Sequence, residues 1–211
     1  MIVAMSGNAT RGRISLAIRG LEPLALAQPA LHDAVLSVAR PEDHVDAFAA
    51  ELGAGLRPKL LYTIPDHQNP AGVTLAAERR AALVELARRY GFLIVEDVAY
   101  RELGFGGSAL ESLWSLGPDV VVQAGTTSKT FFPGVRLGWA AGPAEVVAQL
   151  VSAKQNTDQC SGALGQRLFE EYVRRGWIDE QLVQSRALYA GRCARMLTAL
   201  EHSMPPEVEW T

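Results

Sequence analysis

Lysine is scarce in this chain of 211 residues, although lysine and arginine together fill 20 positions. The lysines are Lys59, Lys129 and Lys154. Cysteine is scarcer still, since Cys160 and Cys193 lie far apart, form no Cys-x-x-Cys pair and accompany no histidine cluster. These spacings predict neither a metal site nor a disulfide framework. We expect two reduced, buried thiols, as is usual in a cytoplasmic protein.

Long apolar runs and an excess of charge of one sign are also missing. No stretch approaches the ~20 apolar residues that a membrane-spanning helix needs, and the first residues lack the order of a secretory signal. The formal net charge of −3 and the pI near 5.8 indicate no basic surface for nucleic acid or an anionic membrane. We therefore expect a cytoplasmic protein that has neither nucleic acid nor a membrane as a partner.

Short apolar runs alternate with helical patterns from residue 41 onward. Four runs predict strands, at residues 59–64, 92–95, 119–124 and 138–141. The second run ends in the acidic pair Glu96-Asp97. Strands of this kind, separated by helical segments, predict an α/β fold with a mainly parallel sheet flanked by helices.

The helical patterns lie between and after these strands. One helix is predicted between residues 41 and 55, and a second from an N-cap at Thr74 to Tyr90, where Gly91 ends it. The paired arginines 79–80 and 88–89 are expected on the outer, solvated face of this second helix. From Pro143 the pattern predicts C-terminal helices, the last of them long.

Polar residues follow the ends of the predicted strands, where an open α/β sheet binds its ligands. They supply an amide, a carboxylate, a phenol, hydroxyls, an amine and a guanidinium, from Asn69, Asp97, Tyr100, Thr126, Ser128, Lys129 and Arg136. A partly desolvated lysine can act as a nucleophile toward a carbonyl, and hydroxyls beside an arginine suit a phosphate. Taken singly, Asp97 could be a helix cap, Lys129 a solvated lysine and Arg136 a surface ion-pair partner. Composition and spacing alone therefore indicate a phosphate-containing ligand.

Three segments resemble, in the right order, the signatures of the class I/II aminotransferases, which are pyridoxal-phosphate (PLP) enzymes of fold type I. They are Tyr62-Thr-Ile-Pro-Asp-His-Gln-Asn-Pro-Ala-Gly72, Val95-Glu-Asp-Val-Ala-Tyr-Arg-Glu102 and Gly125-Thr-Thr-Ser-Lys-Thr-Phe-Phe-Pro-Gly-Val-Arg-Leu-Gly-Trp139. From about residue 45 to the C-terminus the chain is most similar to the aminoadipate/kynurenine-type aminotransferases and to the aminotransferase-like domain of GntR-type regulators.

The resemblance implies a role for each polar residue. Lys129 would form the Schiff base with PLP and carry the proton during catalysis. Asp97 would pair with the pyridinium nitrogen. Tyr100 and Asn69 would bond the phenolate oxygen of PLP, and Asn69 would also lie near the substrate carboxylate. The PLP phosphate would be held by Thr126, Ser128 and Arg136.

The implied activity is the PLP-dependent transfer of an amino group between an amino acid and a 2-oxo acid, in a homodimer when the protein is full length. Two alternatives remain open: a PLP-binding effector domain of a GntR-type transcription regulator, and an inactive fragment. A winged helix-turn-helix preceding this sequence would favour the regulator.

The resemblance also implies a division of the chain. Residues 1–44 stay unassigned, residues 45–177 would form the central part of an incomplete PLP-binding large domain, and residues 178–211 the long interdomain helix and the start of a truncated small domain. The glycine-containing phosphate loop, the ring-stacking aromatic residue and the carboxylate-binding arginine of the family have no counterpart here. We therefore expect a fragment.

Overall fold

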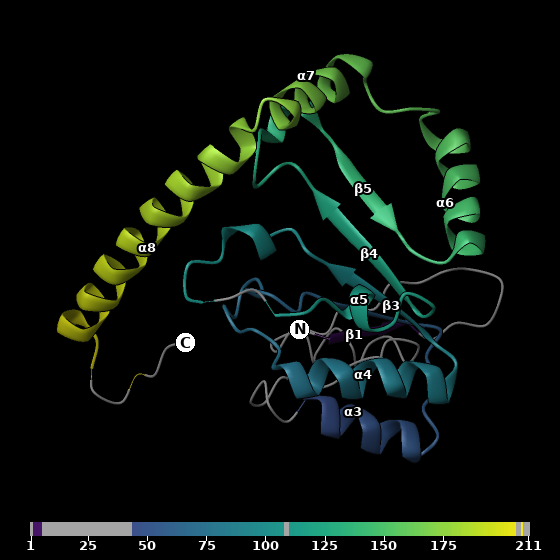
Figure 1. The fold of residues 1–211 in the computed structure, drawn as a ribbon. Helices are drawn as coiled ribbons and strands as arrows, with labels where there is room; N and C mark the ends of the chain where they lie inside the picture. The colour runs from purple at the N-terminus through teal and green to yellow at the C-terminus, as the bar shows by residue number, and fades with distance from the viewer. Residues whose placement is uncertain (1, 6–43, 108–109, 206–207, 209–211) are drawn as a thin grey trace.

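The computed structural model describes residues 2–5, 44–107, 110–205 and 208 (Figure 1). Five strands in these ranges form one sheet in the order β1-β2-β3-β4-β5. Their bounds are Ile2–Met5 for β1, Leu60–Thr63 for β2, Leu93–Asp97 for β3, Val121–Thr126 for β4 and Gly138–Ala141 for β5. The central strands β2, β3 and β4 run parallel, whereas β1 and β5 run antiparallel to their neighbours. The predicted α/β fold, with a mainly parallel sheet flanked by helices, is confirmed.

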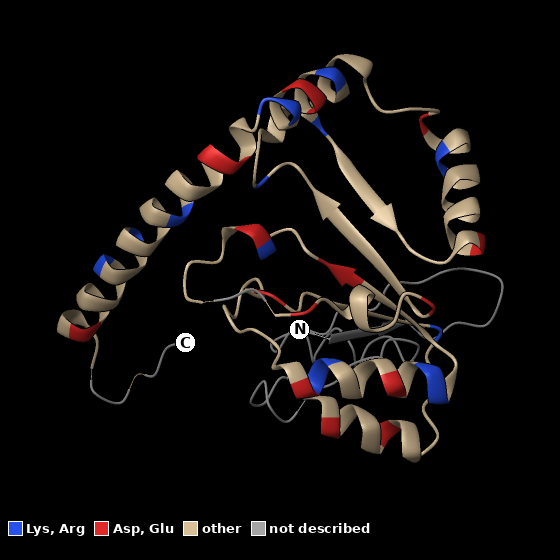
Figure 2. Ribbon diagram, viewed as in Figure 1, with Lys and Arg blue, Asp and Glu red and all other residues tan. Residues whose placement is uncertain are grey.

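The strand ends differ from the predicted ones by a few residues. The pair Glu96-Asp97 ends β3, as predicted, whereas β4 begins and ends two residues later than predicted, at Val121 and Thr126. The acidic pair stays in β3 because the two strands pair there, with Glu96 opposite Gln123 and Asp97 opposite Ala124. Backbone hydrogen bonding between the strands thus continues after the apolar run has ended. The acidic residues of β3 consequently lie at the carboxyl end of this central strand. In Figure 2 the end of β3 is acidic, whereas β4 and β5 carry no charged residue.

One face of the sheet is covered by helices α3 (His44–Gly53) and α4 (Ala77–Tyr90), which lie side by side in Figure 1. The short helix α5 (Leu113–Leu116) adds Leu113 to the same core. The fully or nearly fully buried members are Phe48, Leu52, Leu61, Leu83, Val84, Ala87, Phe92, Ile94, Leu113 and Val121. Side chains alternate between the two faces along β2 and β3. The residues next to the buried ones in these strands therefore lie on the opposite face, and they are only half-buried.

Helix α4 begins later than predicted, and Thr74 does not cap it. The residue before its first turn is Ala76, which makes no side-chain cap. The Thr74 hydroxyl instead accepts a hydrogen bond from the backbone N–H of His67, at 3.2 Å. The C-terminal prediction is confirmed, because Gly91 adopts a left-handed conformation (φ 70°) and donates its N–H to the carbonyl of Ala87.

The prediction that Arg80 lies on a solvated helix face is wrong. Its side chain is fully buried and forms an ion pair of 2.6 Å with Asp66. The same guanidinium donates to the carbonyls of Pro65, Leu75 and Glu111. A buried arginine is tolerated where its donors are satisfied in this way. It anchors the loop after β2, which carries Asn69.

Three helices follow the sheet, as predicted: α6 (Ala144–Thr157), α7 (Ala163–Arg174) and α8 (Trp177–Ser203). Helix α8 extends beside the sheet as a long arm (Figure 1). Many of their apolar side chains are exposed, among them Leu164 and Val183, at 75% and 65%. No described helix is long and apolar enough to cross a membrane. The unassigned segment 1–44 lies outside the described residues except for β1 and His44, and so does the end of the chain from residue 206, apart from Val208.

The expectation of buried cysteines is wrong for Cys160, which is exposed, while Cys193 is half-buried. Both thiols are free. Cys160 follows the end of α6, and Cys193 lies on α8. The helical pattern around them correctly predicted helices, but these helices present much of their apolar surface to solvent rather than to a core.

Candidate active site

The polar residues selected from the sequence gather at the carboxyl ends of the three parallel strands. Asn69 lies in the loop after β2, Asp97 and Tyr100 lie at and after the end of β3, and Ser128 and Lys129 follow β4. Parallel strands place these ends at one edge of the sheet. The predicted convergence therefore has its structural basis in β2, β3 and β4.

Asn69, Tyr100 and Lys129 form the first contact group. The Asn69 amide donates to the Tyr100 hydroxyl at 3.2 Å. The Lys129 amine lies over the Tyr100 ring, 5.6 Å from its centroid, a distance at which a cation is attracted to the ring face. The Asn69–Pro70 peptide bond is cis. One phenol thus links an amide on the first loop with the amine after the third strand.

Asp97 is held by two hydrogen bonds of its own. The Tyr62 hydroxyl donates to Oδ2 at 2.6 Å, and the backbone N–H of Ala99 donates to Oδ1 at 3.0 Å. Burial raises the pKa of the Tyr62 phenol well above its usual range, and the adjacent Asp97 carboxylate raises this pKa further. Tyr62 consequently stays protonated and acts as a donor.

The hydroxyls after β4 form a third group. Thr126 donates to the hydroxyl of Ser128 at 3.0 Å and lies 3.2 Å from the carbonyl oxygen of Leu137. The backbone N–H of Ser128 donates back to the Thr126 hydroxyl at 3.1 Å. Arg136 ends the short helix η3 (Pro133–Val135) in a left-handed conformation, and its exposed guanidinium donates to the Pro133 carbonyl. The structure therefore pairs the two hydroxyls with each other, while the Arg136 side chain turns back to its own short helix.

A cavity of about 450 Å³ is lined by members of the first and third groups, whereas its lining residues do not include Asn69, Asp97, Thr126 and Arg136. Tyr100, Ser128 and Lys129 line it together with Tyr189 of α8. Its other lining residues are His67, Leu103, Gly104 and Phe105. The cavity has a size suited to a small organic ligand, and it places an amine, a phenol and a hydroxyl on one surface.

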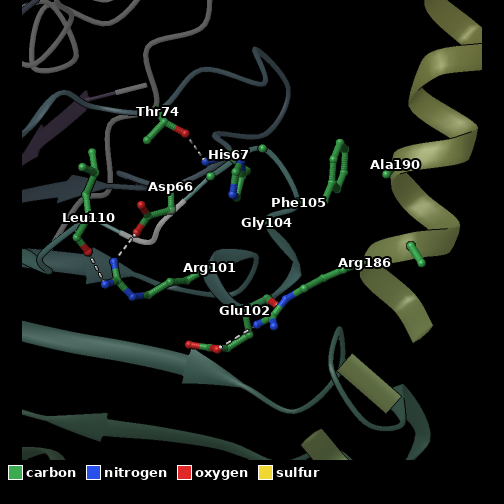
Figure 3. A pocket seen from close by; sticks show the side chains of 13 residues that line it. Asp66, His67, Thr74, Arg101, Glu102, Gly104, Phe105, Leu110, Arg186 and Ala190 are labelled. Carbon is green, nitrogen blue, oxygen red and sulfur yellow. Dashed lines mark hydrogen bonds and ion pairs between the residues drawn. The ribbon is translucent and has the colours of Figure 1, made fainter. Parts of the chain in front are cut away.

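Figure 3 shows a second cavity, of about 800 Å³. It shares the lining residues His67, Gly104 and Phe105 with the first. Asp66 lines it and is paired with Arg101 at 2.8 Å, in addition to Arg80. Arg101 opens the short helix η2 (Arg101–Leu103) and also donates to the carbonyl of Leu110. The two ion pairs tie the loop of Asn69 to the segment of Tyr100, so this buried network supports the site.

Sequence reasoning missed Tyr62, Arg101 and Tyr189. Tyr62 stands inside the first of the three signature segments, and the period of two along β2 and β3 could have identified its place on the face of Asp97. Arg101 lies next to Tyr100 and carries no signal of its own. Tyr189 reaches the cavity from α8, far along the chain, and no local pattern indicates how that helix packs.

A family model described as aminotransferase class I and II matches residues 46–210. The chain belongs to this family. The aromatic-amino-acid aminotransferase 1 of Thermococcus litoralis is 40% identical over 158 residues, which are 74% of this chain and 38% of that protein. Among solved structures, LysN of Thermus thermophilus, an α-aminoadipate aminotransferase complexed with N-(5'-phosphopyridoxyl)-L-leucine, is similar with a TM-score of 0.77 at 36% identity. That similarity covers 84% of this chain and 46% of the LysN chain.

Other proteins similar to this chain are regulators. An uncharacterized HTH-type transcriptional regulator of Bacillus subtilis is 35% identical over 129 residues, which are 61% of this chain and 27% of that protein. The chain spans about two fifths of the length of the first curated aminotransferases that it matches. The resemblance to both groups is thereby confirmed, and the fold is that of the aminotransferases.

Proposed function

We propose that this chain forms the central part of the PLP site of an aminotransferase, which moves an amino group between an amino acid and a 2-oxo acid. The observation that carries the proposal is the cavity in which the Lys129 amine lies with Tyr100 and Ser128. Membership of the aminotransferase family supports it. So does the phosphopyridoxyl ligand of the similar LysN structure, which contains a PLP skeleton joined to an amino acid.

The donor set at the strand ends fits PLP. The Asp97 carboxylate suits a protonated ring nitrogen, and the Tyr100 hydroxyl and Asn69 amide suit the ring oxygen. The hydroxyls of Thr126 and Ser128 suit the phosphate. Arg136 would join them once its side chain rotated away from the Pro133 carbonyl, which an exposed guanidinium can do readily. When bound, PLP supplies an aldehyde carbon and a ring that withdraws electrons from the reacting carbon.

The residues of this chain then have separate tasks. Lys129 provides the amine that bonds covalently to a carbonyl, and it takes and returns the proton at the substrate Cα. Asp97 keeps a proton on the ring nitrogen by its negative charge. Tyr100 holds the Lys129 amine over its ring and, with Asn69, fixes the ring oxygen. Asn69 would also bind the substrate carboxylate.

Further parts of the proposal concern the whole protein. Residues 45–177 would belong to the PLP-binding large domain, and residues 178–211 to the interdomain helix and the start of a small domain. The exposed apolar side chains of α7 and α8 are consistent with burial against more protein, as in a full-length homodimer. The free thiols of Cys160 and Cys193 are consistent with a cytoplasmic location.

A second candidate function is a PLP-binding effector domain of a GntR-type regulator. The observation in its favour is the similarity to the HTH-type regulator of Bacillus subtilis. Both candidates need the cofactor, but only the first needs turnover. A full-length protein that binds PLP on Lys129 and converts no amino acid, while binding DNA, would favour the regulator.

The proposal is tested by trapping the cofactor on the protein. PLP added to the full-length protein should give a visible absorption band, which borohydride reduction should make permanent. Peptide mapping should then find the pyridoxyl group on Lys129. Lys129→Arg should abolish the band and leave the melting temperature unchanged, because the guanidinium keeps the charge but does not deprotonate.

Lys154→Arg is the matched control. Lys154 is an exposed lysine of α6 paired with Asp158 at 2.9 Å, and arginine can keep that pair. The control should retain both the band and the label on Lys129. Label on Lys59 or Lys154, or a band that survives Lys129→Arg, would overturn the assignment.

A further inference from the structure

Tyr62 and Asp97 lie on neighbouring strands and on the same face of the sheet. Tyr62 of β2 pairs in register with Val95 of β3. Asp97 is two residues beyond Val95, so its side chain points to the same side, one step closer to the carboxyl edge. The side chains of Tyr62, Val95 and Asp97 are half-buried and lie on the face of the sheet opposite α3 and α4. The phenol of Tyr62 spans this diagonal and reaches the Asp97 carboxylate.

The two hydrogen bonds to Asp97 are divided between its oxygens. Tyr62 donates to Oδ2 and the backbone N–H of Ala99 donates to Oδ1. Each carboxylate oxygen has two acceptor sites, so each keeps one for a ligand. A backbone donor on one oxygen and a side-chain donor on the other fix the rotation of the carboxylate plane, which neither bond would fix alone.

We propose that Tyr62 is a positioning residue, which holds the Asp97 carboxylate in the orientation that meets the ring nitrogen of the cofactor. This inference rests on the proposed function. A phenol has one O–H donor, and Tyr62 gives it to Asp97, so Tyr62 acts through this carboxylate and not on the ligand. The two phenols of the site therefore differ in task. Tyr100 faces the ligand, and Tyr62 lies behind the carboxylate.

A phenol suits this position better than a charged donor. It neutralises none of the negative charge that Asp97 must present, and its raised pKa keeps it protonated over the working pH range. The distance of 2.6 Å between the Tyr62 hydroxyl oxygen and Oδ2 of Asp97 is typical of an O–H group that donates to a charged acceptor. Phenylalanine would preserve the ring packing and remove the hydroxyl alone, so it isolates the bond to Asp97.

The test compares Tyr62→Phe with the unchanged full-length protein loaded with PLP that is ¹⁵N-labelled in its ring. The ¹⁵N shift should show the ring nitrogen losing its proton at lower pH in the variant. PLP should bind about tenfold more weakly, which is the size expected for one lost hydrogen bond to a charged group. The kcat should fall by a similar factor, while KM for the amino acid stays within about twofold, because Tyr62 does not contact substrate.

The matched control is Tyr90→Phe, which removes a hydroxyl from another half-buried tyrosine, on the far side of the sheet and packed against Arg57 and Arg89. It should leave the ¹⁵N titration and PLP affinity unchanged. A purely structural role for Tyr62 would lower the melting temperature of Tyr62→Phe without moving the ¹⁵N titration, and that result would overturn the inference.

Asp97→Asn separates this inference from the proposed function. It should itself abolish protonation of the ring nitrogen, and Tyr62→Phe added to it should have little further effect, since both act through one carboxylate. No effect of Asp97→Asn would refute the PLP assignment. An effect of Asp97→Asn with none of Tyr62→Phe would refute only the role of Tyr62.

A second variant covers the case in which Tyr62→Phe fails to fold. Tyr62→Leu also lacks a donor and, being smaller, makes different demands on the packing around β2. It should shift the ¹⁵N titration in the same direction as Tyr62→Phe. A titration identical to that of the unchanged protein would count against the inference.

Discussion

Replacing Arg80 by methionine removes the charge and the donors of a fully buried side chain while keeping most of its volume. Arg80 holds Asp66 through an ion pair of 2.6 Å, and both side chains are almost completely shielded, at 0% and 6% exposure. The carbonyls of Leu75 and Glu111 also lose the guanidinium as a donor, while that of Pro65 keeps the backbone N–H of Leu75. Arg101 stays paired with Asp66, so the carboxylate keeps one of its two cationic partners.

The size of the effect follows from these contacts. Breaking a buried ion pair by removing one partner costs about 3–5 kcal/mol, because the other charge is left in a medium of low dielectric. Since Arg101 remains, the lower part of that range, about 3–4 kcal/mol, is expected. Domains have a total stability of about 5–15 kcal/mol, so the variant should melt roughly 6–16 °C lower. Binding of PLP should weaken severalfold as well, because Asp66 anchors the loop that carries Asn69.

Urea unfolding followed by tryptophan fluorescence and circular dichroism measures the loss. The matched control is Arg167→Met, which removes an exposed arginine paired with Glu170, at 79% and 61% exposure. Exposed pairs are worth about 0–1 kcal/mol, so this control should stay near the unchanged protein. A loss for Arg80→Met within about 1 kcal/mol of the control would refute the reasoning that the Arg80–Asp66 network holds the loop.

Two further substitutions test the packing of the core between the sheet and its covering helices. Gly117→Ala should destabilise by about 1–3 kcal/mol, because a Cβ there would meet the Val84 side chain of the core at 2.5 Å; Gly162→Ala, with open space around it, is its control in the same thermal melt. Glu96→Gln should cost about 2 kcal/mol, because the buried carboxylate accepts from two backbone N–H groups at the start of α5 and from Gln123. Calorimetry showing either variant as stable as the unchanged protein would contradict these contacts.

The strands were predictable because their signal is local. Four apolar runs of the right length were enough to find β2 to β5, and Gly138–Ala141 was found with both its ends. The bounds of β4 were less predictable, since Gly125 and Thr126 follow the apolar run and stay in the strand through pairing with β5. Pairing between strands is a tertiary property, and the residues of one strand alone do not determine where it stops.

Arg80 and Thr74 show how polar residues mislead a local prediction. The buried residues of α4 include Leu83 and Ala87, at helical spacing, but the helical period alone assigned the charged residues to solvent by default. Arg80 is buried because Asp66, from the preceding loop, neutralises it. Thr74 has the right chemistry for a cap, yet its hydroxyl bonds His67 of the same loop, and the helix starts only at Ala77. In both cases the loop after β2 supplies the partner, and no periodic pattern determines the path of that loop.

The candidate site was predictable to the extent that strands fix it. Residues at the ends of three parallel strands must meet at one edge, and the contact of Asn69 with Tyr100 and of Tyr100 with Lys129 follows from that rule. Residues that reach the site from a face or from a distant helix follow from other rules. Tyr62 obeys the alternation of side chains along β2, so two registered strands suffice to find it. Tyr189 depends on how α8 packs beside the sheet, which is set by tertiary contacts and by no pattern within the helix itself.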